Sequence, residues 1–206
     1  MTLANRITFL RVILAPAFFL LYLIPENCPV WAWAHPILIV ALLWVIFLIA
    51  EITDGLDGMV ARRFNQSSDF GRLFDPLADT LVQVTFFLCF VLDGIFPAAL
   101  FLVVVYREFG ILFVRNLMLK KGITMGARMS GKIKTTAYII ACSTAMVYAS
   151  LTRLYLYTQP IAFLTPIFRV AAVVVFAISV VISVASFFDY VSVYLVAKKE
   201  VQGAAE

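Results

Sequence analysis

The stretch that decides the fold runs from residue 36 to residue 79 and reads PILIVALLWVIFLIAEITDGLDGMVARRFNQSSDFGRLFDPLAD. It opens with an apolar run, 36–52, in which Glu51 is the only charged residue. A membrane-crossing helix needs about 20 such residues. An acidic segment with two glycines follows, and a second apolar run begins near residue 71. Because the connection 62–70 is short, we expect these two helices to be antiparallel neighbours.

The composition of the whole chain agrees with this interpretation. Of its 206 residues, 64% are hydrophobic and 14% are charged, whereas soluble domains average about 45–50% apolar and about 25% charged residues. This excludes a cytosolic enzyme and a disordered regulator. The apolar runs are separate and of helix-spanning length, at 7–24, 36–52, 71–93, 97–119, 133–151 and 167–197. They predict an all-α, polytopic integral membrane protein with six transmembrane helices in a single domain, 1–206.

The placement of the positive charges predicts the orientation. If the N-terminus is cytoplasmic and the helices alternate, 14 of the 16 Lys and Arg residues fall on the inner side, and only Arg153 and Arg169 fall outside. Cytoplasmic loops carry such an excess of Lys and Arg. We therefore expect both termini to be cytoplasmic, in a multi-pass protein of the cell inner membrane. We expect the protein to contact membrane lipid and to bind no nucleic acid.

Four aspartates mark the inner ends of the helices predicted at 36–52 and 71–93. Asp54 and Asp57 are three residues apart, and Asp75 and Asp79 are four apart, so each pair shares one helical face. Carboxylates this close would repel each other strongly at a membrane boundary unless a cation neutralised them. Because the chain has one histidine and three scattered cysteines, the oxygen-only ligand set favours Mg²⁺ or Mn²⁺.

An alternative interpretation exists for Asp75 alone. An aspartate directly before a proline is typical of a helix N-cap with proline in the first turn, and Pro76 follows Asp75. Four acids on two facing helices are harder to explain by capping, because charged groups near the bilayer are costly and usually functional. Small residues flank the acids at Gly58, Ala61 and Gly71, and they would let a bulky ligand lie against the backbone.

At these residues the chain resembles a known family. The pattern D-x2-D-G-x2-A-R-x8-G-x3-D-x3-D, filled from Asp54 to Asp79, is similar to the signature of the CDP-alcohol phosphatidyltransferases. That resemblance implies six transmembrane helices, an active site on the cytoplasmic side, and metal ligation by Asp54, Asp57, Asp75 and Asp79. It also implies that Asp79 is the general base for the acceptor hydroxyl. The pocket for the CDP part of the donor would be lined by Gly58, Ala61, Arg62 and Gly71.

Basic residues form a second group. Arg107 and Arg115 are eight residues apart, close to two helical turns, and therefore share a face. Arg107 lies inside an apolar run beside Glu108. A buried guanidinium needs a partner, which could be Glu108, the aspartates or a bound anion. Further positive residues follow at Arg128, Lys132 and Lys134.

These segments resemble the glycerol-3-phosphate branch of the same family. The shared features are Arg107-Glu108 with Arg115, and the run GKIKTT at 131–136. By this resemblance, the acceptor phosphate would be held by Arg107, Arg115, Arg128, Lys132 and Lys134, and the nucleotide would lie near Asn5, Thr8 and Arg11. The branch often has Lys and Trp where this chain has Thr80 and Ser130. Inositol phosphate, serine or another alcohol therefore stays open as the acceptor.

The resemblance predicts transfer of the phosphatidyl group from CDP-diacylglycerol to sn-glycerol 3-phosphate, giving phosphatidylglycerophosphate and CMP, with help from a divalent metal. It also suggests a homodimer. The rival from another class is a divalent-cation transporter, since intramembrane aspartates are also ion ligands. All four aspartates lie at one membrane face, and basic residues follow them along the chain, which favours the transferase.

Overall fold

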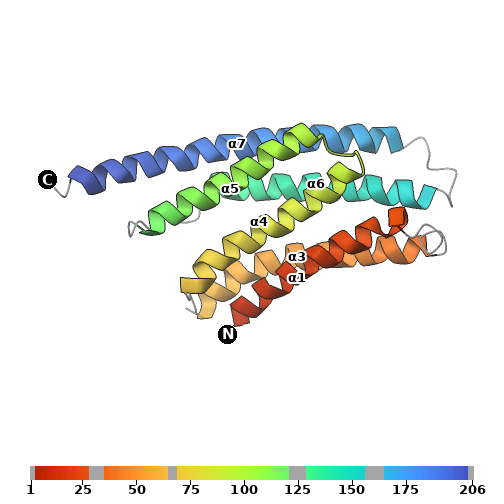
Figure 1. Cartoon of the computed structure of the whole chain (residues 1–206), viewed down its shortest axis with the longest axis horizontal. Helices are drawn as coiled ribbons and strands as arrows, with labels where there is room; N and C mark the ends of the chain where they lie inside the picture. Colours follow the sequence, from red (N-terminus) through yellow and green to blue (C-terminus); the bar gives the residue numbers. More distant parts are fainter. Residues whose placement is uncertain (1–2, 28–34, 65–68, 121–128, 156–164, 204–206) are drawn as a thin grey trace.

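The computed structural model describes the backbone of residues 3–27, 35–64, 69–120, 129–155 and 165–203, and the side chains of 8–24, 35–54, 74–118, 129–154 and 165–196. The described backbone is helical apart from residue 35 and the turn at 93–97, and it contains no strand. The prediction of an all-α protein is confirmed. The helices lie side by side in an elongated bundle (Figure 1). They are α1 (Leu3–Asn27), α3 (Pro36–Phe64), α4 (Asp69–Leu92), α5 (Ala98–Lys120), α6 (Met129–Tyr155) and α7 (Thr165–Gly203).

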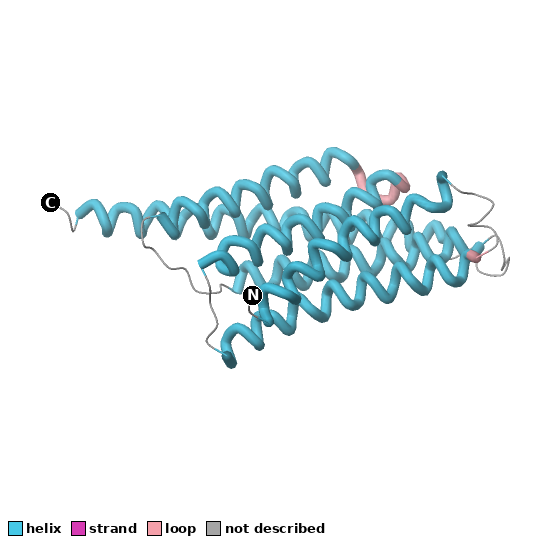
Figure 2. The backbone as a smooth tube through the Cα atoms, turned by 60° about the horizontal axis from the view of Figure 1, so that its bottom comes forward, coloured by secondary structure: helices cyan, strands magenta, loops and turns pink. Residues whose placement is uncertain are grey.

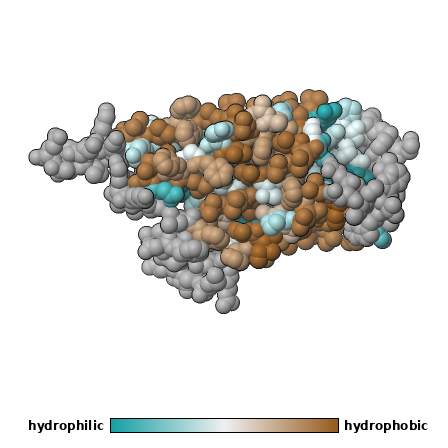
Figure 3. All heavy atoms as spheres, viewed as in Figure 1, coloured by the Kyte–Doolittle hydropathy of each residue, from teal (hydrophilic) through white to brown (hydrophobic). Residues whose placement is uncertain are grey.

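Four of these helices are long and apolar enough to cross a membrane, and they contain the spans Pro36–Asp54, Phe74–Leu92, Met129–Leu154 and Thr165–Val196. In α1 the apolar stretch Thr8–Ile24 is shorter, and α5 carries Arg107, Glu108 and Arg115 within its length. Apolar side chains cover most of the described surface on the face seen in Figure 3. Large apolar side chains are exposed on several helices, for example Ile37 of α3 (73%) and Val181 of α7 (69%). Such a surface suits hydrocarbon better than water and is typical of a multi-pass membrane protein.

Aromatic side chains form the centre of the bundle. Phe87 of α4 packs edge-to-face on Tyr138 of α6 and on Phe176 of α7, with ring centroids 5.0 and 5.1 Å apart. Phe18 of α1 packs on Phe86 at 4.6 Å in the same way. Edge-to-face pairs at these distances add to the free energy of burial. The core therefore joins α1, α4, α6 and α7.

Helix α1 has a position that the sequence analysis did not foresee. We expected α3 and α4 to be direct neighbours. Among the described residues this expectation is wrong, because α3 and α4 contact each other little, whereas α1 packs extensively against both of them. Arg11 of α1 bonds to an aspartate on each. The short connection between α3 and α4 fixes their antiparallel order, but it does not prevent a third helix from packing against both.

A tight turn at the far end of α4 reverses the chain into α5 (pink in Figure 2). Gly94 has φ +66, a conformation that residues with a Cβ rarely adopt. Next to this turn, the hydroxyl of Tyr22 donates to Asp93 at 2.5 Å, and the guanidinium of Arg153 lies over the Tyr22 ring at 3.9 Å. These contacts fasten α1, the end of α4 and α6 together, about 20 Å along α4 from Asp79. They anchor the helices that carry the candidate site.

Candidate active site

Two side chains of α1 hold the aspartates of α3 and α4. The Thr8 hydroxyl donates to Asp75 Oδ1 at 2.8 Å. Arg11 Nη1 lies 2.5 Å from both Asp54 Oδ1 and Asp79 Oδ1. Thr8 and Arg11 are three residues apart and so share a face of α1. The helix thereby gathers three of the four predicted metal ligands around one end of the bundle.

The exposure of these groups shows which way they face. The Arg11 side chain is 2% exposed, while those of Asp54 and Asp79 are 37% and 48% exposed. The guanidinium is therefore buried behind the carboxylates, which keep open surface toward a cavity. Charge-assisted hydrogen bonds of this kind fix carboxylate orientation.

The N-cap alternative for Asp75 is wrong. Helix α4 begins at Asp69, so Asp75 and Pro76 lie in its second turn, with Pro76 inside the helix. Proline has no amide hydrogen to donate there. The Thr80 hydroxyl donates to the Pro76 carbonyl oxygen at 3.0 Å. Asp75 therefore presents its side chain from a helical turn, where it reaches Thr8 instead of capping the helix.

A cavity of about 470 Å³ extends from these carboxylates to a basic wall. On the acidic side it is lined by Arg11, Glu51, Asp54 and Asp79 from α1, α3 and α4. On the opposite side α5 and α6 contribute Arg107, Glu108, Arg115, Lys132 and Lys134, and α7 contributes Tyr190. Four of the five basic residues predicted to hold the acceptor phosphate thus line the same cavity as two of the predicted metal ligands.

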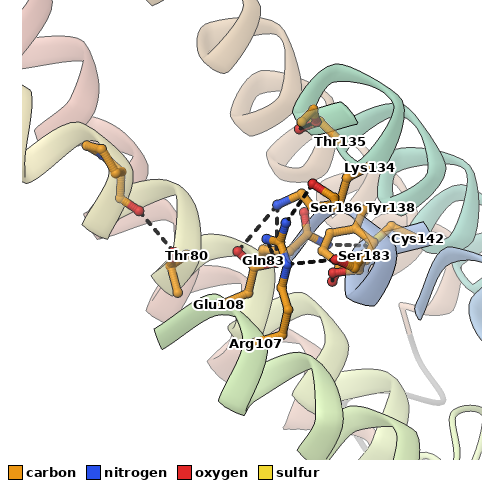
Figure 4. A network of polar contacts seen from close by, with 12 residues as sticks. Thr80, Gln83, Arg107, Glu108, Lys134, Thr135, Tyr138, Cys142, Ser183 and Ser186 are labelled. Carbon is orange, nitrogen blue, oxygen red and sulfur yellow. Dashed lines mark hydrogen bonds and ion pairs between the residues drawn. The ribbon is translucent and has the colours of Figure 1, made fainter. Parts of the chain in front are cut away.

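Arg107 is held by a network of hydrogen bonds (Figure 4). Its Nε donates to the Ser183 carbonyl at 3.0 Å, its Nη1 to Glu108 Oε1 at 2.8 Å, and its Nη2 to Ser186 Oγ at 3.1 Å. The residue is 7% exposed. Of the three partners considered from the sequence, the structure thus provides Glu108. Three of the five guanidinium N–H groups are used, which leaves two for another acceptor.

Glu108 also holds Lys134. The Lys134 ammonium lies 3.2 and 3.3 Å from the two Glu108 oxygens and 4.7 Å from the centre of the Tyr138 ring. The Tyr138 hydroxyl is 2.5 Å from Ser183 Oγ. Sequence reasoning named Glu108 only as one candidate partner of Arg107. It missed the contributions of Tyr138, Ser183 and Ser186, because no local pattern distinguishes these residues from packing residues.

Several predicted site residues cannot be placed by their side chains. Asp57, Gly58, Ala61 and Arg62 lie in the last part of α3, Gly71 in the first turn of α4 and Asn5 in the first turn of α1. Only the backbone is described there, and it is helical. Arg128 lies outside the described residues. The roles expected of these residues stay predictions.

The donors present fit a hard divalent cation. No group of three or more His, Cys, Asp or Glu side chains that could hold a metal ion occurs within the described part of the chain, which does not include the side chain of Asp57. Asp54 and Asp79, however, already converge on a single positively charged nitrogen of Arg11. Mg²⁺ and Mn²⁺ bind preferentially to oxygen ligands such as carboxylates, and the two carboxylates that share the Arg11 guanidinium are close enough together to share a metal ion.

A cavity in a bundle of apolar helices, with carboxylates on one wall and Arg and Lys on the other, is suited to a membrane enzyme that transfers a phosphate-containing group. The comparisons with known proteins give the particular family. The family model for CDP-alcohol phosphatidyltransferase matches residues 1–185. The chain belongs to this family, and the prediction from its aspartate motif is confirmed.

Curated relatives share most of the chain. A protein of Treponema pallidum is 36% identical over 205 residues, which cover 98% of this chain and 94% of the relative. Proteins of Bacillus subtilis and Escherichia coli are each 35% identical, over 71% and 66% of this chain and 77% and 71% of their own lengths. All three are named CDP-diacylglycerol–glycerol-3-phosphate 3-phosphatidyltransferase.

Proposed function

We propose that this enzyme transfers the phosphatidyl group from CDP-diacylglycerol to sn-glycerol 3-phosphate, giving phosphatidylglycerophosphate and CMP. The names of the relatives support this reaction. The observation that carries it is the single cavity that joins Asp54 and Asp79 to Arg115, Lys132 and Lys134. An acceptor with a hydroxyl at one end and a phosphate at the other matches these two walls.

The reaction requires a proton acceptor beside the acceptor hydroxyl. That hydroxyl oxygen attacks the lipid-side phosphorus of CDP-diacylglycerol, the bond from this phosphorus to the bridging oxygen breaks, and CMP leaves with the electron pair. Asp79 takes the proton from the hydroxyl. Arg11 fixes the direction of this carboxylate through the contact described above. Mg²⁺ or Mn²⁺ held by Asp54, Asp57, Asp75 and Asp79 would neutralise charge on the pyrophosphate.

The two substrates would use different parts of the site. The CDP part of the donor would lie against Gly58, Ala61, Arg62 and Gly71, close to Asn5, Thr8 and Arg11. The acceptor phosphate would lie among Arg107, Arg115, Arg128, Lys132 and Lys134. The cavity lining supports this division, because the two predicted metal ligands in it come from α3 and α4, whereas the basic residues predicted to hold the acceptor phosphate come from α5 and α6.

The same proposal includes the arrangement in the membrane. We infer six spans in one domain, 1–206, with both termini and the active site on the cytoplasmic face of the inner membrane, and a homodimer. The positive charges support the orientation, because 14 of 16 Lys and Arg residues fall on one side when the spans alternate.

CMP release by purified protein tests the reaction. With CDP-diacylglycerol and Mg²⁺ in detergent, we expect release with sn-glycerol 3-phosphate and its loss on addition of EDTA. Inositol 1-phosphate, inositol and serine, offered separately, should give no more than background. Release with one of these instead would keep the transfer chemistry and change the acceptor. No release with any acceptor from folded protein would contradict the transferase, and ion flux would be the next measurement.

Arg115→Ala tests the basic wall. Arg115 lines the cavity and its side chain is exposed, so its removal should weaken phosphate binding with little effect on the fold. We expect the KM for sn-glycerol 3-phosphate to rise about ten-fold or more, while the KM for CDP-diacylglycerol changes by less than two-fold. Equal rises in both constants would contradict the assignment. The matched control is Arg169→Ala, on the exposed surface of α7 near its start.

A further inference from the structure

Glu51 is a carboxylate in the cavity wall that the proposed mechanism does not use. It lies three residues before Asp54 on α3, and it is the only charged residue in the segment 36–53. Its side chain lines the cavity. It forms no hydrogen bond and no ion pair with any described residue, although Asp54 and Arg11 are near enough to interact with its charge.

A carboxylate in this position needs an explanation. The segment Pro36–Asp54 of α3 is long and apolar enough to cross a membrane, and an ionisable group in such a segment is costly unless it has a partner. Glu108, on the other side of the cavity, has two cationic partners. Among the residues whose side chains the structure describes, Glu51 has no such partner, and it lines space that a substrate can enter. Its missing partner is therefore best supplied by a bound molecule.

Gln83 lies at the same depth on the opposing helix. It follows Asp79 by four residues on α4 and also lines the cavity. Its side-chain amide nitrogen, Nε2, donates to Cys142 Sγ at 3.4 Å (Figure 4). Its side-chain oxygen, Oε1, forms no hydrogen bond with any described residue. Helices α3 and α4 are antiparallel. Glu51, one turn before Asp54, and Gln83, one turn after Asp79, are therefore both displaced in the same direction, away from the polar end of the bundle. Glu51 and Gln83 thus occupy the inner level of the cavity, one turn deeper than the reacting carboxylate.

The chemistry of the Glu51 carboxylate and the Gln83 amide indicates which part of a substrate they would bind. A carboxylate repels phosphate, and it accepts hydrogen bonds from hydroxyls. The acceptor named under the proposed function has two hydroxyls. In the proposed reaction the terminal hydroxyl reacts next to Asp79 and the phosphate lies at the basic wall, so the central hydroxyl would lie between them.

We propose that Glu51, with Gln83 beside it, binds the central, non-reacting hydroxyl of the acceptor. This inference rests on the proposed function and adds a specificity determinant to it. A site that is built to bond a hydroxyl rejects an analogue lacking that hydroxyl, since its own polar groups are then left unpaired. The enzyme should therefore distinguish acceptor alcohols with a neighbouring hydroxyl from those without one.

The test compares sn-glycerol 3-phosphate with 3-hydroxypropyl phosphate, which keeps the terminal hydroxyl and the phosphate and lacks the central hydroxyl. We expect the native enzyme to prefer sn-glycerol 3-phosphate by at least about ten-fold in kcat/KM. In Glu51→Ala this preference should fall to within about three-fold, with Glu51→Gln in between. The matched control is Ile52→Ala, the adjacent position on α3, whose side chain is 59% exposed on the apolar surface; it should keep the native preference.

Other outcomes would overturn the inference. Equal losses with both acceptors, or a shift in the Mg²⁺ concentration needed for activity without a change in preference, would assign Glu51 to the metal site or to the fold. An effect confined to the KM for CDP-diacylglycerol would assign it to the nucleotide. If the Glu51 variants do not fold, Gln83→Leu replaces them, and an unchanged preference there would reject the proposal.

Turnover of the two acceptors by the native enzyme tests this inference and the proposed function separately. Equal turnover of both acceptors would refute the hydroxyl site and leave the transferase intact. No CMP release with either acceptor would remove the proposed function, and this inference with it.

Discussion

Asp79→Asn is expected to lower kcat by at least about 100-fold, because it removes the proton acceptor and one ligand of the proposed metal site. The protein should still fold. The asparagine side chain is the same size and keeps an oxygen toward Arg11, and Arg11 keeps its contact with Asp54. The measurement is CMP release at saturating substrates, with circular dichroism and elution volume in detergent as checks on folding.

The control for this variant lies at the other end of the same helix. Asp93→Asn changes the same side-chain type just after α4, where Asp93 accepts the Tyr22 hydroxyl. It should affect stability more than turnover, with kcat within about two-fold of native because the site is about 20 Å away. If folded Asp79→Asn retained full activity, the assignment of Asp79 as general base would have to be given up.

Glu108→Ala is expected to cause the largest loss of stability. It would leave Arg107 and Lys134 without their shared counter-charge, and the side chains of these residues are only 6% and 16% exposed. Removing one partner of a buried ion pair costs about 3–5 kcal/mol, which corresponds to a fall in Tm of about 6–20 °C for a chain of this size. Thermal unfolding in one detergent, followed by circular dichroism, measures this shift.

Its neighbour provides the matched control. Phe109 lies next to Glu108 on α5 and is 49% exposed on the apolar surface. Phe109→Ala should shift Tm by less than about 3 °C, since it removes a lipid-facing side chain and leaves no charge unpaired. A Tm for Glu108→Ala within that same margin would mean that water in the cavity solvates Arg107 and Lys134, and that Glu108 does not stabilise the network.

The sequence predicted the helices well because their signals are local. Each apolar run became a helix. Helix α3, however, continues to Phe64, twelve residues beyond the predicted apolar run. The acidic segment is helical too, because no proline interrupts it and good helix formers (Met59, Ala61 and Arg62) follow its glycines. The N-cap interpretation of Asp75 failed because α4 begins six residues earlier, at Asp69, and contains Pro76 in its interior.

What the sequence by itself determined is which carboxylates share a helical face at one end of the bundle. The aspartates come in two pairs, Asp54 with Asp57 and Asp75 with Asp79, whose members are three or four residues apart. Residues at that spacing share a helical face. It also determined the family, because the motif lies within one short stretch. The basic residues could be grouped in the same way, by sharing a helical face or a loop.

Only the tertiary structure decided how these groups are held. Arg11 and Asp54 are 43 residues apart in sequence, and Arg107 and Ser186 are 79 apart. Whether such residues meet depends on which helices pack together, and no local pattern encodes that. The packing of α1 against both α3 and α4 makes Arg11 the residue that bonds to a carboxylate on each of them. The packing of α7 on α5 gave Arg107 its serine partners. The packing of α3 against α1 and α6 left Glu51 in the cavity wall with no hydrogen-bond partner among the described residues.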